Sequence, residues 1–161
     1  MEQLTLIHEP LPYKYIIDTS SILSQKDNEP HRRRVYGRLW GNIDELIKKQ
    51  IIITCSEIKD EIKDNEILLW LNNCSCTIMD IDDEVQEHVK TVVTQCPRLI
   101  DFKNMRSSGD AFLIATAMKY SLTVITEENQ DSDKKIPHVC RTLGVPCVNI
   151  LGLCEVEGWS F

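Results

Sequence analysis

The sequence predicts an α/β protein, a three-layer α/β/α sandwich with a mainly parallel central sheet. Short apolar runs rich in β-branched residues recur along the chain at 15–17, 51–54 and 122–126. Such runs are typical of strands that are buried on both faces of a parallel sheet. Segments with the three- and four-residue spacing of amphipathic helices lie between them. Because the two patterns alternate throughout the chain, they favour a layered α/β domain.

The length and composition indicate an ordinary globular protein. A chain of 161 residues can form one domain with a full-sized core. We expect a single domain over 1–161, with an irregular N-terminal arm at 1–13 and a C-terminal tail at 150–161. The longest uninterrupted apolar run, 67–71, is too short to span a membrane, and the first residues lack the basic start of a signal peptide. We therefore expect a cytoplasmic protein with no membrane partner.

The charge and the cysteines exclude some classes of function. A net charge of −7 repels nucleic acid at long range, which counts against a protein that simply coats DNA. A nuclease is compatible with this charge when its acids surround metal ions and its basic residues form a local patch. Cys74 and Cys76 form a close pair, but a zinc site usually needs a second such cluster.

The clearest helical pattern follows a polar loop at 24–31. Its apolar residues form one stripe: Val35, Tyr36, Leu39, Trp40, Ile43, Leu46 and Ile47. We interpret Tyr36 and Trp40 as core residues on this basis. Weaker strands are expected at 77–81 and 145–150. Two further helices are expected to begin after the N-caps Ser56 and Asp82, and a third is expected to begin at Asp110. The remaining helices are expected over 66–73, from 136 to a C-cap at Gly144, and over 150–157.

Carboxylates follow the predicted strands or begin the predicted helices at four places: Asp18, the group Glu57, Asp60 and Glu61, then Asp110, and the pair Glu127 and Glu128. Ligands of open α/β sheets gather outside the carboxyl ends of the strands, so these acids are expected to converge. Converging carboxylates repel each other unless cations lie between them. Mg²⁺ or Mn²⁺ binds such oxygens and leaves room for a phosphate. Two such ions can activate water for hydrolysis of a phosphodiester.

Each acid also has a simpler structural interpretation. Asp18 and Asp110 are suitable helix or turn caps, Glu57 suits the first turn of a helix, and Glu127 and Glu128 could form a solvated loop pair. Taken singly, these structural roles are favoured. Taken as an ordered set at corresponding strand ends, the acids favour a functional site.

Four segments, in this order and at this spacing, resemble the PIN-domain nucleases: Ile16–Ser20, Glu61 after its strand, Asp110–Ala115 and Val124–Glu128. The resemblance covers residues 14–150 and is greatest to small prokaryotic, VapC-toxin-like PIN proteins, whose C-terminal part reads as 135–140 and 158–161 do here. It implies a compact α/β/α fold, a Mg²⁺ or Mn²⁺ cofactor, and hydrolysis of single-stranded or structured RNA. Members are often the toxins of toxin–antitoxin pairs.

The resemblance implies a catalytic and metal-binding role for Asp18, which ends the first strand, and for Asp110, which begins the buried helix. Glu61 matches the second acid of the family better than Glu57, which is the alternative. The fourth position is usually Asp, and Glu128 stands at the matching offset, with Glu127 as the alternative. A Glu where the family usually has Asp is a departure from its pattern, and this position is one that would help to hold a second metal ion.

Substrate contacts and partners complete the expected site. Hydroxyl and basic residues are expected to contact RNA: Thr19, Ser20, Thr126, Arg32, Arg33, Arg34, Lys103 and Arg106. A run of three arginines is also commonly a solvated helix face. We expect an inhibitory antitoxin-like protein, since an unrestrained cytoplasmic ribonuclease is dangerous. We also expect a homodimer through an apolar patch of Trp70, Trp159 and Phe161.

Other functions fit less well. A haloacid-dehalogenase-type phosphatase needs a second Asp two residues after the first, where this chain has Ser20. A dinucleotide-binding domain needs a glycine-rich turn after the first strand, which is missing here. A catalytically weak PIN-like protein-interaction or regulatory module remains the alternative. Binding of a divalent ion and cleavage of RNA would separate it from the nuclease.

Overall fold

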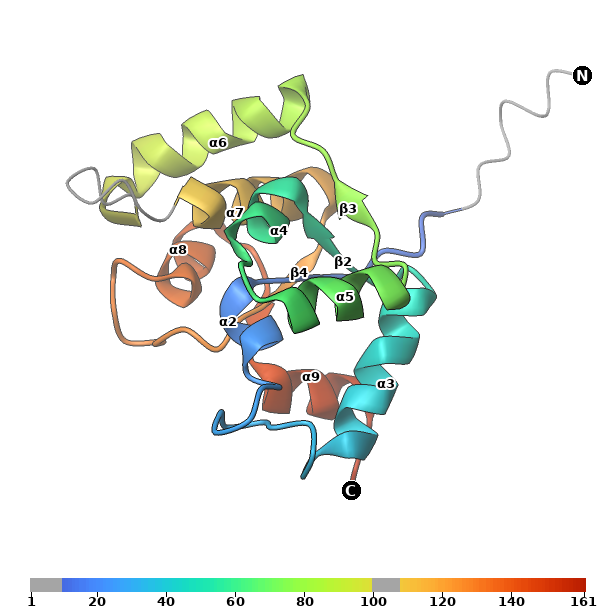
Figure 1. The fold of residues 1–161 in the computed structure, drawn as a ribbon. Coiled ribbons are helices and arrows are strands. Elements are labelled where there is room, and N and C mark those ends of the chain that lie inside the picture. Colours follow the sequence, from blue (N-terminus) through green and yellow to red (C-terminus); the bar gives the residue numbers. More distant parts are fainter. Residues whose placement is uncertain (1–9, 100–107) are drawn as a thin grey trace, which may run out of the picture.

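The computed structural model describes residues 10–99 and 108–161. Within these residues the centre is a five-stranded, wholly parallel sheet with the order β3-β2-β1-β4-β5. The strands are short: β1 (Tyr15–Ile17), β2 (Ile52–Cys55), β3 (Ile78–Met79), β4 (Thr123–Ile125) and β5 (Cys147–Val148). The parallel sheet with helices around it confirms the predicted fold class (Figure 1).

Helices cover both sides of this sheet. In Figure 1, α6 and α7 lie on one side, and α3 and α9 lie on the other. The helical elements are α2 (Thr19–Leu23), α3 (Gly37–Lys48), α4 (Ser56–Glu61), α5 (Asn65–Asn73), α6 (Asp83–Gln95), the 3₁₀ turn η1 (Pro97–Leu99), α7 (Ser108–Tyr120), α8 (Ile136–Leu143) and α9 (Ile150–Glu157). The three predicted layers are therefore present.

Strand β1 lies at the centre of the core. Ile16 pairs in register with Ile53 on one side and with Val124 on the other, and all three are fully buried. Helix α7 packs against β1, β2 and β4 with small and branched residues such as Ala111 and Ile114. Each fully buried aliphatic side chain contributes about 1.5–3 kcal/mol. This packing places the carboxyl end of β1 at the middle of the sheet edge.

The prediction for the start of the long helix was wrong. Helix α3 begins at Gly37, and Val35 and Tyr36 are 63% and 46% exposed. The amides of both residues donate to the carbonyl of Arg32, which makes a turn before the helix. The apolar stripe thus begins two residues before the helix that it predicts. Trp40 is fully buried, as predicted.

Caps agree with the sequence in most places. Asp82 caps α6, and Gly144 ends α8 with a φ of +72°, a conformation that suits glycine. Ser56, in contrast, is the first residue of α4 rather than its cap. Residues 10–14 contain neither helix nor strand, and residues 1–9 lie outside the described ranges, so the expected arm at 1–13 stays a prediction. Among the described helices, none combines the length and apolarity needed to cross a membrane.

Candidate active site

Asp18 directly follows β1 and caps the short helix α2. Its Oδ1 accepts a hydrogen bond from the Ser21 amide at 3.0 Å, and Thr126 Oγ1 donates to Oδ2 at 2.8 Å. The Ser20 hydroxyl lies 2.9 Å and 3.0 Å from the two carboxylate oxygens. Asp18 is only 1% exposed. The expected hydroxyl residues Ser20 and Thr126 therefore do surround this acid.

Burial and the charges of neighbouring acids affect the pKa values of two aspartates here. Burial raises the pKa of Asp18 to about 7, although its three hydrogen bonds oppose the shift and Glu128 adds to it. Burial also raises the pKa of Asp110, in the first turn of α7, to about 8. The charges of Glu128, Asp18 and Glu61 add to that second shift, whereas Lys135 opposes it. The four acids therefore share one electrostatic environment.

Glu61 is the last residue of α4, and its carboxylate is held beside α2. Thr19 Oγ1 donates to Glu61 Oε2 at 2.8 Å. Glu61 is exposed as a whole residue, but partial burial of its carboxyl group raises its pKa; the Thr19 hydrogen bond opposes this shift, and the charges of Glu128 and Glu57 add to it. Glu57 lies one turn earlier on the same helix, and no hydrogen bond to its carboxylate is formed by the described residues. The geometry favours Glu61 over the alternative Glu57.

Glu127 and Glu128 turn in different directions. Glu127 Oε2 accepts from the amide of Ile150 at 2.8 Å, at the start of α9, and its Oε1 lies 3.7 Å from His31 Nδ1. Glu128 Oε1 accepts from the amide of Ile136 at 3.0 Å, at the start of α8. The charge of Glu128 also acts on all three other acids. The structure thus groups Glu128, and not Glu127, with Asp18.

The oxygen ligands fit a hard divalent cation in kind. Within the described residues, no three His, Cys, Asp or Glu side chains are close enough together to hold a metal ion. Three of the acids instead accept hydrogen bonds from nearby donors: Asp18 from the Ser21 amide, Glu61 from Thr19 and Glu128 from the amide of Ile136. Carboxylate oxygens are among the ligands that Mg²⁺ and Mn²⁺ prefer. Burial is the largest cause of the raised pKa values and the charge of Glu128 adds to them, so a cation here would favour the ionised acids.

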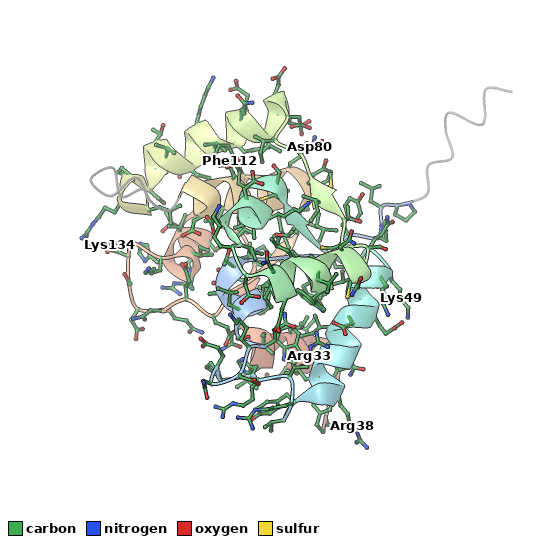
Figure 2. All side chains as sticks on the ribbon, viewed as in Figure 1. Arg33, Arg38, Lys49, Asp80, Phe112 and Lys134 are labelled. Carbon is green, nitrogen blue, oxygen red and sulfur yellow. The ribbon has the colours of Figure 1, made fainter. Side chains whose placement is uncertain are left out.

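The arginine run does not converge on these acids. The guanidinium of Arg33 forms two hydrogen bonds to Asp44 at 2.9 Å and 3.0 Å, and it also bonds to Gln25. It lies over the rings of Trp40 and Trp70, between α3 and α5 (Figure 2). Arg33 is therefore held in a structural contact.

The other expected basic contacts are more exposed or fall outside the described ranges. Arg34 forms an exposed ion pair with Asp27 at 3.2 Å, and Arg32 Nε donates to the carbonyl of Glu29 at 3.0 Å. Lys103 and Arg106 lie outside the residues that the structure describes. The predicted path of RNA over these residues stays a prediction.

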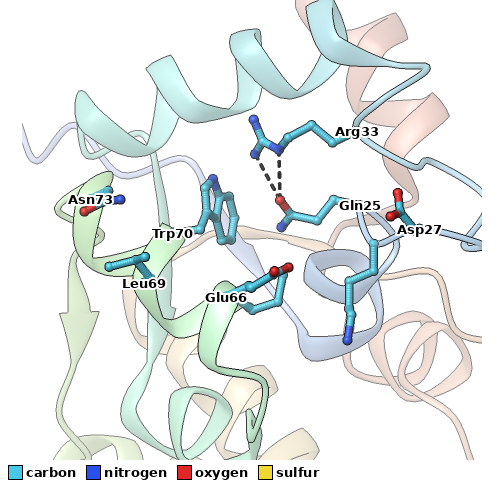
Figure 3. Close-up of a pocket in the computed structure, with 9 residues that line it drawn as sticks. Gln25, Asp27, Arg33, Glu66, Leu69, Trp70 and Asn73 are labelled. Carbon is cyan, nitrogen blue, oxygen red and sulfur yellow. Dashed lines mark hydrogen bonds between the residues drawn. The ribbon is translucent and has the colours of Figure 1, made fainter.

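A surface groove lies beside Arg33, away from the four acids. Figure 3 shows Arg33 and Gln25 bonded on one side, with Trp70 and Leu69 of α5 nearby. The groove has a volume of about 520 Å³, and its lining includes none of the four acids. Leu69 is 59% exposed. This groove is a separate feature from the acidic cluster.

Sequence reasoning missed two residues next to the cluster. Gly109 precedes Asp110, and a Cβ at this position would lie 1.9 Å from Glu61 Oε1. Gly109 stands directly before the helix predicted from Asp110, and a glycine at such a place can mark a close approach of the backbone to another group. Lys135 precedes α8, and its charge opposes the rise in the pKa of Asp110 that burial and the neighbouring acids cause. Nothing in the sequence distinguishes it from its neighbour Lys134.

The fold is that of PIN-domain proteins, as comparison with solved structures shows. One similar structure is a chain of VapBC2 from Rickettsia felis, whose complex is bound to a DNA fragment from the VapBC2 promoter. It is 18% identical to this chain, with a TM-score of 0.55, and the alignment covers 84% of this chain and 97% of that one. FitAcB from Neisseria gonorrhoeae has 17% identity and a TM-score of 0.54, covering 85% and 98%. PAE2754 from Pyrobaculum aerophilum has 14% identity and a TM-score of 0.51, covering 89% and 88%.

The chain belongs to the family described as a domain of unknown function (DUF4411), whose model matches residues 15–161. The match includes the whole sheet and all four acids. No curated protein matches the sequence.

Proposed function

We propose that the protein is a Mg²⁺- or Mn²⁺-dependent endoribonuclease whose acidic set is Asp18, Glu61, Asp110 and Glu128. The observation that carries this proposal is the mutual effect of these acids. The pKa values of Asp18, Asp110 and Glu61 are all raised by burial and by the charge of Glu128, at the carboxyl edge of the sheet. A bound divalent ion would activate water and neutralise the charge that develops on the phosphodiester.

The chain's own residues would orient this site. The Ser21 amide and the hydroxyls of Ser20 and Thr126 hold Asp18 in one orientation, so little reorganisation is needed when it binds an ion. Thr19 does the same for Glu61. Because Asp18 is buried, its charge acts in a medium of low dielectric constant, where electrostatic interactions are strong.

The first test is an RNA-cleavage assay in Mn²⁺ with wild type, Asp18→Asn and Asp110→Asn. RNA integrity should be lost with wild type and preserved with each variant. Single-stranded DNA of the same sequence serves as the comparison substrate, since the resemblance to PIN-domain nucleases implies RNA. Equal cleavage of DNA and RNA would contradict the substrate assignment while leaving phosphodiester hydrolysis in place.

An inhibitory protein partner, as in a toxin–antitoxin pair, forms the second part of the proposal. Its support is the PIN-like fold shared with chains of VapBC2 and FitAcB, together with the net charge of −7. A partner that presents basic side chains would be attracted to the acidic cluster, and an Arg could bind these carboxylates in two places at once. Co-expression with the adjacent gene followed by co-purification tests this directly, and an Arg→Ala change in the partner should restore cleavage.

The expected homodimer stays a proposal, and of the three residues of its apolar patch only Phe161 is largely exposed. Trp70 is half-buried, and its Nε1 donates to Asp44 at 2.8 Å. Trp159 packs partly against the core, whereas Phe161 is 65% exposed. Light scattering of wild type and Phe161→Ser measures the oligomeric state. A monomeric wild type would contradict the dimer.

A catalytically weak interaction module is the alternative function. It is favoured by the protein donors that already satisfy the carboxylates of Asp18, Glu61 and Glu128. Calorimetry with Mn²⁺ separates the two functions before any RNA assay. A nuclease site should bind Mn²⁺ in wild type and lose this binding in Asp18→Asn, whereas an interaction module needs no metal ion.

A further inference from the structure

Glu61 and Gly109 come from α4 and α7, two helices that pack against each other (Figure 1). A Cβ on Gly109 would lie 1.9 Å from Glu61 Oε1 and 2.8 Å from its Cδ. Both distances are shorter than real Cβ contacts. The carboxylate of Glu61 therefore occupies the space that any other residue at position 109 would need.

The backbone does not explain why this position is glycine. Gly144 and Gly158 have positive φ values, but Gly109 does not, and it lies in the first turn of the 13-residue helix α7. Alanine is more favourable than glycine in a helix. Gly109 is a poor helix former, and among the described glycines it is the one whose Cβ would meet Glu61.

We propose that Gly109 is a positioning residue that keeps the Glu61 carboxylate beside Asp110. On the other side of the same carboxylate, Thr19 Oγ1 donates to Oε2 at 2.8 Å. Thr19 and Gly109 together select the position of a long, flexible side chain at the end of α4. This inference rests on the proposed function, because it assigns Glu61 and Asp110 to a shared divalent cation.

The experiment compares Gly109→Ala with Gly41→Ala. Gly41 is also helical, in α3, and a Cβ there meets no atom within 4 Å, so it is a matched control. Mn²⁺ affinity is measured by calorimetry, RNA cleavage by initial rates, and folding by thermal unfolding. Gly109→Ala should weaken Mn²⁺ binding by about tenfold or more, as loss of supporting contacts at metal sites does. Its unfolding temperature should not fall, because Glu61 can swing away while alanine favours the helix. Gly41→Ala should bind Mn²⁺ as wild type does.

A cycle with Glu61 identifies the mechanism. In a Glu61→Ala background, Gly109→Ala should cause no further loss of Mn²⁺ affinity, because no carboxylate remains to be displaced. Combining Gly109→Ala with Glu61→Asp should recover part of the affinity, since the shorter side chain avoids the new methyl group. An equal loss with and without Glu61, or a fall in unfolding temperature that parallels the loss of affinity, would show that Gly109 serves packing alone.

The failures of the two proposals can be told apart. A wild type that binds Mn²⁺ and cuts RNA, with Gly109→Ala equal to it, overturns the positioning role and leaves the proposed function intact. A wild type that does neither overturns both. Should Gly109→Ala fail to fold, Thr19→Val tests the same restraint from the other side. It removes the hydrogen bond to Glu61 without changing the backbone of α7, and wild-type Mn²⁺ affinity in that variant would overturn the inference.

Discussion

Thr126 Oγ1 donates a 2.8 Å hydrogen bond to Asp18 Oδ2, and this bond joins the carboxyl ends of the adjacent strands β4 and β1. The same hydroxyl accepts from the amide of Glu128 at 3.1 Å, so Thr126 connects two of the four acids. Ser20 Oγ bonds to Asp18 and accepts from the amide of Glu127 at 3.0 Å. A buried carboxylate is thereby fixed at the centre of the sheet edge.

The protein without metal should become less stable as the pH rises from about 4 to about 8. Burial raises the pKa of Asp18 to about 7 and that of Asp110 to about 8, from the ordinary value of 3.8 for an aspartate. Over this interval the folded chain binds more protons than the unfolded chain, so the free energy of unfolding falls with rising pH. The combined effect is on the order of a few kcal/mol, because one pKa unit corresponds to about 1.4 kcal/mol and the two acids are coupled.

Urea unfolding in a chelator at pH 5 and pH 8 measures this effect. The double variant Asp18→Asn, Asp110→Asn should show a much flatter dependence, since neither side chain titrates. A wild type whose stability is equal at both pH values, or greater at pH 8, would contradict the raised pKa values and the electrostatic argument for the site.

Glu61→Gln should reduce RNA cleavage at least about tenfold, and Glu57→Gln much less. Only Glu61 has its carboxylate held by Thr19, and Ile58 is fully buried between the two acids along the helix. Initial rates in Mn²⁺ for both variants test the choice. Equal losses would show that the second acid has been assigned wrongly.

Glu128→Gln should reduce cleavage more than Glu127→Gln. Glutamine keeps an acceptor for the backbone amides that each glutamate binds, so the two changes mainly remove charge. Only the charge of Glu128 acts on Asp18, Glu61 and Asp110. Glu127→Ala, in contrast, should cost about 1 kcal/mol of stability, because it removes the acceptor at the start of α9. Rates and urea unfolding measure both effects, and the reverse order of rates would favour Glu127 as the fourth acid.

Arg33→Ala should destabilise the fold rather than weaken RNA binding. Burial alone would raise the pKa of Asp44, but hydrogen bonds from Arg33 and Trp70 lower it, so loss of Arg33 leaves a half-buried acid poorly paired. We expect a loss of about 1–3 kcal/mol in urea unfolding. Arg34→Ala is the control, because its ion pair with Asp27 is 60% and 77% exposed and should contribute less than about 1 kcal/mol. An unchanged stability with a raised KM would instead support the substrate role expected from the sequence.

The sheet and the grouping of the acids were predictable because parallel strands end at one edge. The β-branched runs before Asp18 and Glu127 therefore indicate both the strands and the convergence of the acids that follow them. The small and apolar residues after Asp110 indicate in the same way a helix that packs closely on the sheet. These inferences need only periodicity and the direction of the strands.

Other features depend on contacts between segments that are distant in the sequence. Arg33 is held by Asp44 and Trp70, and their meeting depends on how α3 and α5 pack. Glu127 and Glu128 have the same chemistry, and only the positions of α8 and α9 show which amide each one binds. Tyr36 fits the apolar stripe but precedes the helix, because a turn at Arg32 intervenes.

The most direct test of the acidic cluster as a metal-dependent ribonuclease is cleavage of a defined RNA in Mn²⁺ by wild type and by the double variant Asp18→Asn, Asp110→Asn. Wild type should cleave, and a chelator should abolish the cleavage. The double variant should be folded, as thermal unfolding will show, and slower by at least about a thousandfold, because it lacks two of the acids that would hold the ion. Cleavage by the folded double variant at the wild-type rate would contradict the account.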